Sequence, residues 1–497
     1  MGHGPSHPSQ LHLSVLHRKG THMRIKTYIR YNPIRELYDE ARLPADIRRS
    51  LNMILLGNIC GTIWGIICGG GTTSMIGLAT QMGASDLHFG ILSAIPQVAA
   101  LLQIPFSVLV NRTHKRKQYM LTWGLFSRVL WLFFGLIPLV MPTAPAAMQL
   151  YSLIFLLGVS SCCGAVINVC WFPWLSDLAP LRMRGRWMSI RESFLAAANV
   201  GFGLLTAYVL DSLPADVRYI IIFLIGGAAG IIDMVCFGFC KEVYSAPPQK
   251  QRMDSAILEV LRNKPFMNLI FMWTAWCFTA NLCAVYLTPY SMNEMGLSFM
   301  QIMLFSTIAA GVVSIFAMPR WGKMIDRFGS RNVMIVSSFA AALTPLFYLF
   351  SSPGNIWPTL LHNTVGAAFW CGCNLTASNM QLSCSPDQSR PMHIAVFSCI
   401  TAFAGTTLGS LTGGALLEGW HGAALFTGSF DRYKALILLS CALRLPLAMF
   451  FASRLTRDNE AAPRALLSYM THAVGHSFSS AANALRAVAS PILRRAK

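Results

Sequence analysis

Long apolar segments are the feature of this sequence that most limits its fold. A helix needs about 20 predominantly apolar residues to cross a bilayer, and twelve segments reach that length. Only 12% of the 497 residues are charged, against about 25% in soluble proteins, so a lipid environment explains the composition. The runs are continuous, which favours helices over the alternating strands of a barrel. The predicted spans are 52–80, 87–110, 119–141, 148–176, 189–210, 217–239, 266–292, 299–319, 333–351, 357–384, 393–417 and 434–454.

Basic residues are distributed unevenly between the two sides of the predicted membrane. Most of the 39 lysines and arginines fall in the terminal segments and in the connections after even-numbered spans. The opposite connections contain only Arg218, Arg432 and Lys434. By the positive-inside rule, this pattern predicts a multi-pass protein of the plasma (inner) membrane with both termini in the cytoplasm. The net charge of +19 is then a consequence of topology, and we expect no nucleic-acid partner.

The sequence offers no pattern for a metal, a cofactor or an enzyme. All 14 cysteines lie within or beside apolar segments, where they are expected to pack as small buried side chains. Neither a phosphate-binding G-x-x-x-x-G-K-[ST] nor a zinc-binding H-E-x-x-H occurs.

Two halves of the chain repeat each other. "GASDLHFG" precedes the second span and "GLSFMQIM" the eighth, and after these spans Gly322-x-x-x-Asp326-Arg327-x-Gly329-x-Arg331 aligns with Ser107-x-x-x-Asn111-Arg112-x-His114-x-Arg116. Matched loops at equivalent positions indicate a duplicated six-helix unit. We expect an all-α membrane protein with twelve transmembrane helices in two pseudo-symmetric bundles. Its parts are a cytoplasmic N-terminal segment 1–50, bundles 51–240 and 266–455, a cytoplasmic linker 241–265 and a cytoplasmic tail 456–497.

These motifs resemble those of the major facilitator superfamily. The second-half loop matches its G-x-x-x-D-R-x-G-x-R pattern, and "LAPLRMRGRW" is similar to its P-x-x-x-R-G-R loop. Three longer stretches, among them "DLAPLRMRGRWMSIRESF", look like a bacterial branch whose substrates are largely unassigned. The resemblance implies transport by alternating access. In the first-half loop Asn111 replaces the acid and His114 the glycine, so a latch there would depend more on arginines.

The resemblance also implies a latch at the cytoplasmic face. An acid facing the N-terminus of a neighbouring helix gains roughly 0.3–1 kcal/mol, whereas charges that only orient helices would not require an acid. This orienting role suffices for Arg320 and Lys323. The gating candidates are Gly322, Asp326, Arg327, Gly329 and Arg331, with Arg112 and Arg116 directed at Asp177, and Arg184 and Arg186 after span four.

Polar side chains at helical spacing mark a candidate substrate cavity. In the family the cavity is lined largely by spans one, four, seven and ten. The candidates there are Trp64, Asn168, Trp171, Asn281, Asn374 and Gln381. The alternative is that these polar groups join helices to one another.

Ionisable residues inside spans are few and suggest function by default. Arg128 lies about 13 Å into span three and Asp233 about 9 Å from the inner end of span six, at about 1.5 Å per residue. We expect them to form an ion pair.

Together these features predict a secondary active or facilitative transporter for a small organic solute, such as a sugar or another metabolite. Coupling to a proton or another cation is compatible with the sequence, and we expect a monomer. Two alternatives stay open: an exporter of amphipathic drugs or lipids, and a non-transporting membrane sensor on a carrier fold.

Overall fold

The computed structural model describes residues 43–113, 115–178, 181–242, 253–386, 389–422 and 431–453. The N-terminal segment up to residue 42 and the tail from residue 454 lie outside this range. Within it, the chain is helical throughout, as predicted, and every predicted span is occupied by helix.

The first half contains six spans, three of them divided. Span one breaks at Cys68–Thr72, and span two passes through a short 3₁₀ turn after Pro96. The elements are α3 (Ala45–Ile67), α4 (Thr73–Gln81), α5 (Asp86–Ala99), η1 (Ala100–Leu102), α6 (Gln103–Thr113), α7 (Arg116–Phe134), α8 (Ile137–Val140), α9 (Ala146–Leu178), α10 (Leu181–Ser212) and α11 (Ala215–Gly238).

The second half follows a linker that contains helix α12 (Met253–Arg262). Its spans eight and eleven each include a π-helical turn, η2 and η4. The elements are α13 (Lys264–Ala284), α14 (Leu287–Asn293), α15 (Phe299–Met303), η2 (Leu304–Ala309), α16 (Ala310–Phe328), α17 (Ser330–Leu343), η3 (Thr344–Phe350), α18 (Trp357–Cys384), α19 (Arg390–Ile400), η4 (Thr401–Thr407), α20 (Leu408–Gly419) and α21 (Arg432–Ser453).

Nine helical segments in the described part are long and apolar enough to cross a membrane. The other three predicted spans are occupied by α7, α18 and α21, helices of 19, 28 and 22 residues. Polar and basic residues within them, such as Arg128 and Arg444, lower their hydropathy. The number of spans is therefore better judged from helix length and the repeat than from hydropathy alone.

The internal repeat extends to the geometry of the turns. Gly83 and Gly296 both adopt positive φ, 75° and 68°, a conformation that glycine adopts without steric cost. Two residues later a serine caps the next helix: Ser85 with His88 and Ser298 with Gln301 form capping boxes. The two Gly-x-Ser turns are thus the same local structure used twice.

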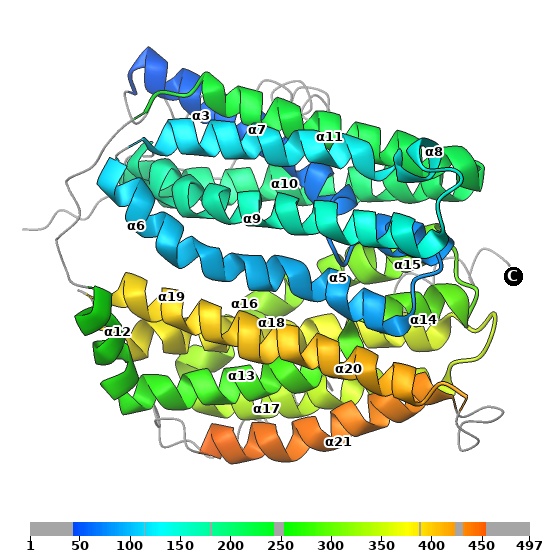
Figure 1. The fold of residues 1–497 in the computed structure, drawn as a ribbon. Coiled ribbons are helices and arrows are strands. Elements are labelled where there is room, and N and C mark those ends of the chain that lie inside the picture. The colour runs from blue at the N-terminus through cyan, green and yellow to red at the C-terminus, as the bar shows by residue number, and fades with distance from the viewer. Residues whose placement is uncertain are drawn as a thin grey trace, which may run out of the picture.

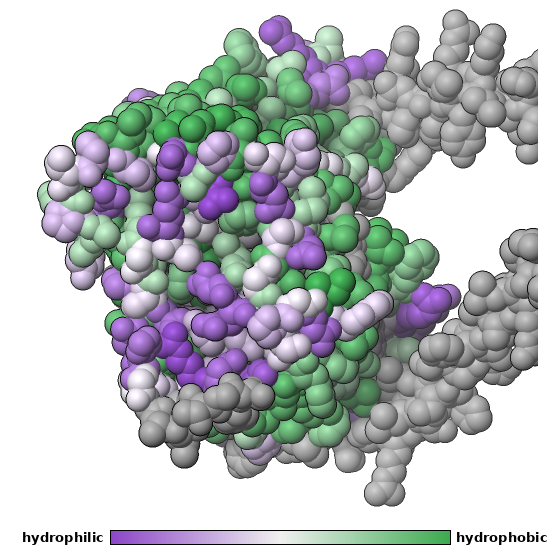
Figure 2. All heavy atoms as spheres, turned by 90° about the vertical axis from the view of Figure 1, so that its right-hand side faces the viewer, coloured by the Kyte–Doolittle hydropathy of each residue, from purple (hydrophilic) through white to green (hydrophobic). Residues whose placement is uncertain are grey.

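The two halves meet mainly at one end of the molecule (Figure 1). We call this the far end; it contains the turns before α5 and α15 and the turn between α10 and α11. The contacts between halves join α5 with α20 and η4, α10 with α15 and η2, and α4 with α14. At the opposite end, which we call the basic end, α6, α16 and α19 pack mainly within their own halves. Figure 2 views the far end, where hydrophilic residues gather across both halves between apolar flanks.

Candidate functional site

A polar cavity lies among the spans of the first half. It has a volume of about 230 Å³ and is enclosed by α3, α7, α9, α10 and α11. Trp64, Asn168 and Trp171, three of the predicted substrate residues, line it together. Its charged lining consists of Arg128, Arg191 and Asp233. The structure therefore places the predicted substrate residues of spans one and four around one cavity.

Arg128 and Asp233 form the base of this cavity. The guanidinium Nη2 lies 3.7 Å from Asp233 Oδ2, and its carbon lies 3.4 Å from the centre of the Trp64 ring. Both charged residues are almost fully buried, with 7% and 4% of their surface exposed. A cation over an indole face gains about 2 kcal/mol or more when desolvated, so Trp64 stabilises the arginine from a third helix.

Glycines allow the three helices to approach this pair closely. A Cβ on Gly61 would lie 2.9 Å from Asp233 Oδ2, and one on Gly230 would lie 2.6 Å from Arg128 Cδ and 2.7 Å from Trp64 Cδ1. These distances are too short for any side chain to fit without movement. Gly61 and Gly230 therefore leave room for the carboxylate of Asp233 and the guanidinium of Arg128 inside the bundle.

A second cavity of about 170 Å³ adjoins the first and shares Trp64, Arg128 and Asn168 with it. Hydroxyl groups line it, among them Ser127 and Ser160, whose Oγ atoms lie 2.9 Å apart. The two cavities therefore present charged, amide and hydroxyl groups on both sides of Trp64 and Arg128.

The predicted residues of the second half lie elsewhere. Asn281 on α13 donates to the backbone oxygen of Cys277 at 2.8 Å, while Asn374 is exposed and Gln381 half-buried on α18. The two cavities described above include none of the three. On the same stripe as Asn281, Cys277 packs against Gly405 of η4, where an added Cβ would lie 2.8 Å from Cys277 Cβ.

A second buried arginine lies in span twelve and is enclosed by protein. Arg444 Nη2 donates to the backbone oxygens of Thr279 and Ala280, both at 3.3 Å, and to Ser440 Oγ at 2.9 Å. Its guanidinium carbon lies 5.4 Å from the Trp276 ring. Carbonyl oxygens thus replace the acid that the sequence lacks at this depth.

At the far end, the two halves are joined by an ionic contact. The sequence analysis did not predict this contact. Asp86, at the start of α5, is 4% exposed. Its carboxylate accepts a hydrogen bond of 2.6 Å from Tyr433 Oη and pairs with Arg432 Nη2 at 3.0 Å. Both partners begin α21 in the second half. One feature of the sequence could have indicated this contact. The connections on the less basic side contain only three basic residues, and Arg432 is one of them.

A second carboxylate at the far end caps a helix of the opposite half. Asp211, near the end of α10, accepts the backbone N–H groups of Phe299 at 3.0 Å and Met300 at 2.8 Å. These are the first two residues of α15, where the helix dipole and unpaired N–H groups favour a negative charge. The far end is therefore closed by two carboxylates of the first half.

Close backbone contact accompanies these carboxylates between α5 and α20. A Cβ on Gly90 would lie 2.6 Å from Tyr286 Oη and 3.0 Å from the Ser410 oxygen, and one on Gly414 would lie 3.0 Å from Leu87 Cα. Tyr286 donates its hydroxyl proton to the Ser410 oxygen.

The predicted gating loop lies at the basic end, between α16 and α17. Gly329 directly precedes α17 and has φ +82°, a backbone conformation that favours glycine. Asp326 and Arg327 are exposed and Arg331 is half-buried. None of the described residues forms an ion pair or hydrogen bond with Asp326. A Cβ on Gly322 would meet open space, so the close approach expected of it is absent in this conformation.

Other gating candidates are only partly described. Arg116 begins α7 and is half-buried, with interactions to its surroundings. The side chains of four further candidates lie outside the described residues: Arg112 on α6, Asp177 on α9, and Arg184 and Arg186 on α10.

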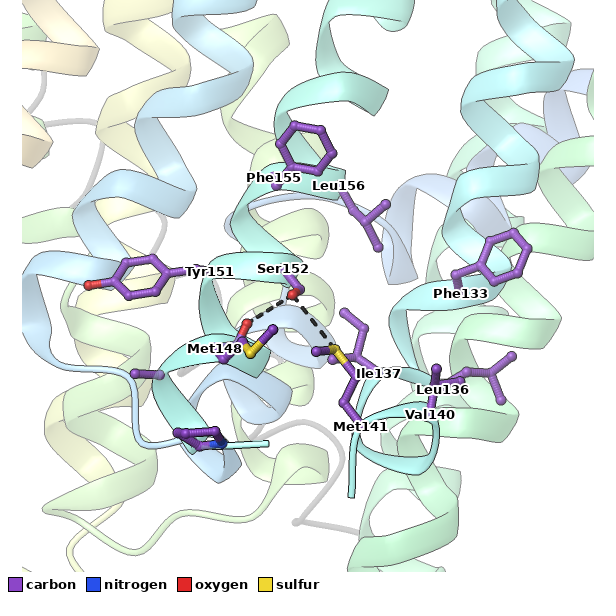
Figure 3. A pocket seen from close by; sticks show the side chains of 12 residues that line it. Phe133, Leu136, Ile137, Val140, Met141, Met148, Tyr151, Ser152, Phe155 and Leu156 are labelled. Carbon is purple, nitrogen blue, oxygen red and sulfur yellow. Dashed lines mark hydrogen bonds between the residues drawn. The ribbon is translucent and has the colours of Figure 1, made fainter. Parts of the chain in front are cut away.

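The largest cavity among those described, about 830 Å³, is an apolar groove between α8 and the start of α9 (Figure 3). Phe133, Val140 and Phe155 line it and are at least half exposed. Ser152 is turned to the Met148 oxygen and the Met141 sulfur. Its composition suits lipid acyl chains, and none of the charged residues described above lines it.

Comparison with known proteins agrees with this architecture. A family model described as Major Facilitator Superfamily matches residues 55–320 and 307–484, and the chain therefore belongs to that superfamily. Among curated proteins, no sequence match is found.

Solved transporters share the fold at low sequence identity. An auto-inhibited peptide transporter of the POT family has a TM-score of 0.63 and 11% identity, covering 83% of this chain and 99% of its own. A nucleoside transporter has 0.58 and 14%, with coverage of 82% and 99%. A D-xylose–proton symporter has 0.59 and 13%, with coverage of 81% and 95%. The chain is a multi-pass membrane transporter, and family and fold point to transport rather than enzymatic chemistry.

Proposed function

We propose that the protein moves a small organic solute, a sugar or another metabolite, across the inner membrane by alternating access. The observation that carries this proposal is the pair of polar cavities around Trp64 and Arg128. Residues from all six spans of the first half line these cavities, and that half contacts its partner mainly at the far end. Alternating access places the substrate site at the interface of the two repeats, and Trp64, Asn168 and Trp171 belong to spans one and four, two of the four spans that the resemblance implies for that interface.

The charged lining of the cavities favours a metabolite over an amphipathic drug or lipid. Pockets for drug-sized ligands are lined predominantly by hydrophobic and aromatic side chains. The cavities around Trp64 measure about 230 and 170 Å³ and contain two arginines and an aspartate. Amphipathic export would instead draw on the groove of Figure 3, whose lining carries no charged group.

The gating loop supports an open basic end in this conformation. Asp326 is exposed and Gly322 lies in open space, while Asp86 and Asp211 hold the far end together. We take the basic end as cytoplasmic, from the distribution of lysine and arginine, so this is the inward-facing state. In the opposite state, Asp326, Arg327 and Arg331 would engage the first half.

Uptake into proteoliposomes tests the proposal. The purified chain is expected to accelerate the entry of at least one radiolabelled solute from a metabolite set over protein-free vesicles. The assay is run with and without a pH gradient, because Asp233 is the carboxyl group of the described cavity and a coupled proton would bind there. Saturable ligand binding without flux would identify a sensor instead and contradict transport.

A further inference from the structure

Charged residues are unevenly balanced in the cavity of the first half. Arg128, Arg191 and Asp233 line it, and two of these three are positive. Arg128 is occupied in part by Asp233, at 3.7 Å. Glu192, the partner of Arg191, does not line the cavity. The cavity itself therefore carries an excess of positive charge.

Hydrogen-bond donors are also in excess there. Four buried nitrogen atoms of lining residues have no hydrogen-bond partner: Asn58 Nδ2, Trp64 Nε1, Arg128 Nε and Arg191 Nε. One buried oxygen, Asp233 Oδ1, is likewise without a partner. Leaving a buried polar atom unsatisfied is unfavourable, so unmet capacity concentrated at one cavity points to a ligand rich in acceptors.

Arg191 is placed to bind an anion from the cavity. Its side chain is 13% exposed, whereas that of its neighbour Glu192 is 64% exposed, so Glu192 is the solvated member of the pair. The guanidinium carbon lies 5.5 Å from the centre of the ring of Trp171, which also lines the cavity. Glu192 engages Nη1, so a carboxylate in the cavity would bind the remaining N–H groups of the guanidinium.

Arg444 of the second half provides an internal comparison. It is also buried and lies near a tryptophan, and its Nε and Trp276 Nε1 likewise have no hydrogen-bond partner. Its Nη2, however, is occupied by backbone oxygens and Ser440. Neither polar cavity of the first half includes Arg444. The cluster in the first half differs because it faces space that a solute can enter.

We infer that the transported solute is a small organic anion with hydroxyl groups, such as a sugar acid, whose carboxylate binds Arg191 beside Arg128. Its hydroxyl groups would donate to Asp233 Oδ1 and meet Ser127 and Ser160 in the adjoining cavity. This inference rests on the proposed function and specifies the charge of its substrate.

Three six-carbon compounds that differ mainly in charge test the inference. D-gluconate, D-sorbitol and D-glucamine are anionic, neutral and cationic, and each is added to the purified full chain at matched ionic strength. Ligand binding raises the thermal midpoint with concentration, which yields the dissociation constant. Gluconate is expected to bind at least tenfold more tightly than sorbitol, about 1.4 kcal/mol, and glucamine most weakly.

Substitutions test whether Arg191 is responsible for the preference for gluconate. Arg191→Gln should weaken gluconate binding at least tenfold, whereas Arg191→Lys should keep the preference for gluconate over sorbitol, because the charge remains. Arg262→Gln removes the same charge from an exposed position on α12 and should leave the affinity unchanged. The inference is overturned if sorbitol or glucamine binds as tightly as gluconate, if none of the three binds, or if Arg191→Gln binds gluconate normally. Flux of a neutral solute would still uphold transport.

Discussion

Asp233 illustrates what a single buried charge demands of its surroundings. Two facing glycines, Gly57 and Gly61, leave room for its carboxylate: an added Cβ would come within 3.2 and 2.9 Å of its oxygens. Arg128 supplies the opposing charge at 3.7 Å. The depths of Arg128 and Asp233 along their helices were enough to predict that they pair, because charged residues are rare within these spans. The stacking of Trp64 on Arg128 was not predictable, since spacing along α3 does not reveal which helix its tryptophan faces.

Asp233→Asn is expected to destabilise the protein by about 3–5 kcal/mol, the usual cost of leaving one member of a buried pair unpaired. The thermal midpoint in detergent measures the loss. Asp216→Asn is the matched control, because Asp216 is exposed and exposed substitutions usually change stability by within about 0.5 kcal/mol. Adding Arg128→Gln to Asp233→Asn should recover part of the loss. An equal effect of the two single variants would contradict the assignment.

At the scale of helices, sequence periodicity predicted where each span lies but not which neighbour it touches. Asn281 of α13 was predicted to line the cavity, and Cys277, one turn earlier on the same face of the helix, packs against Gly405 of η4. A stripe defines one face of a helix, and the partner of that face comes from a different span.

Gly413→Ala is expected to lower the thermal midpoint strongly, since its Cβ would lie 2.1 Å from the Leu282 backbone oxygen of α13. That contact involves main chain, which cannot rotate away. Gly201→Ala on α10 meets no atom within 4 Å and should be neutral or stabilising by up to about 1 kcal/mol, because alanine favours helix. Identical midpoints for the two variants would show that α13 and α20 do not pack this closely.

For the whole molecule, the sequence predicted a duplicated bundle and a gating loop at the basic end, but it did not predict the ionic contact at the far end. The gating loop between α16 and α17 was recognisable because its motif is local. The far-end contact joins Asp86 to Tyr433, 347 positions apart, and no local pattern links them. Contacts between the halves depend on how the bundles dock, which one sequence without homologues does not reveal.

Substitutions at the two ends of the molecule are expected to shift the population of the far-end-open state in opposite directions. Asp86→Asn weakens a buried charge-assisted contact worth about 1.5–3 kcal/mol, so the far-end-open population should rise at least tenfold. Asp326→Asn should instead favour the state with the far end closed. Spin labels at Asp216 and Ser352, both exposed at the far end of opposite halves, report the distance once cysteines that are not fully buried are replaced. Shifts in the same direction would contradict two opposing gates.

The π-helical turns η2 and η4 have a mechanical consequence. η4 interrupts span eleven at Thr401–Thr407, near mid-span, whereas η2 interrupts span eight at Leu304–Ala309, close to the far end. The short turn η1 interrupts span two close to Pro96. Each interruption loosens the regular backbone ladder of its own span, so these three spans can bend individually at the turns while the rest of each bundle keeps its packing.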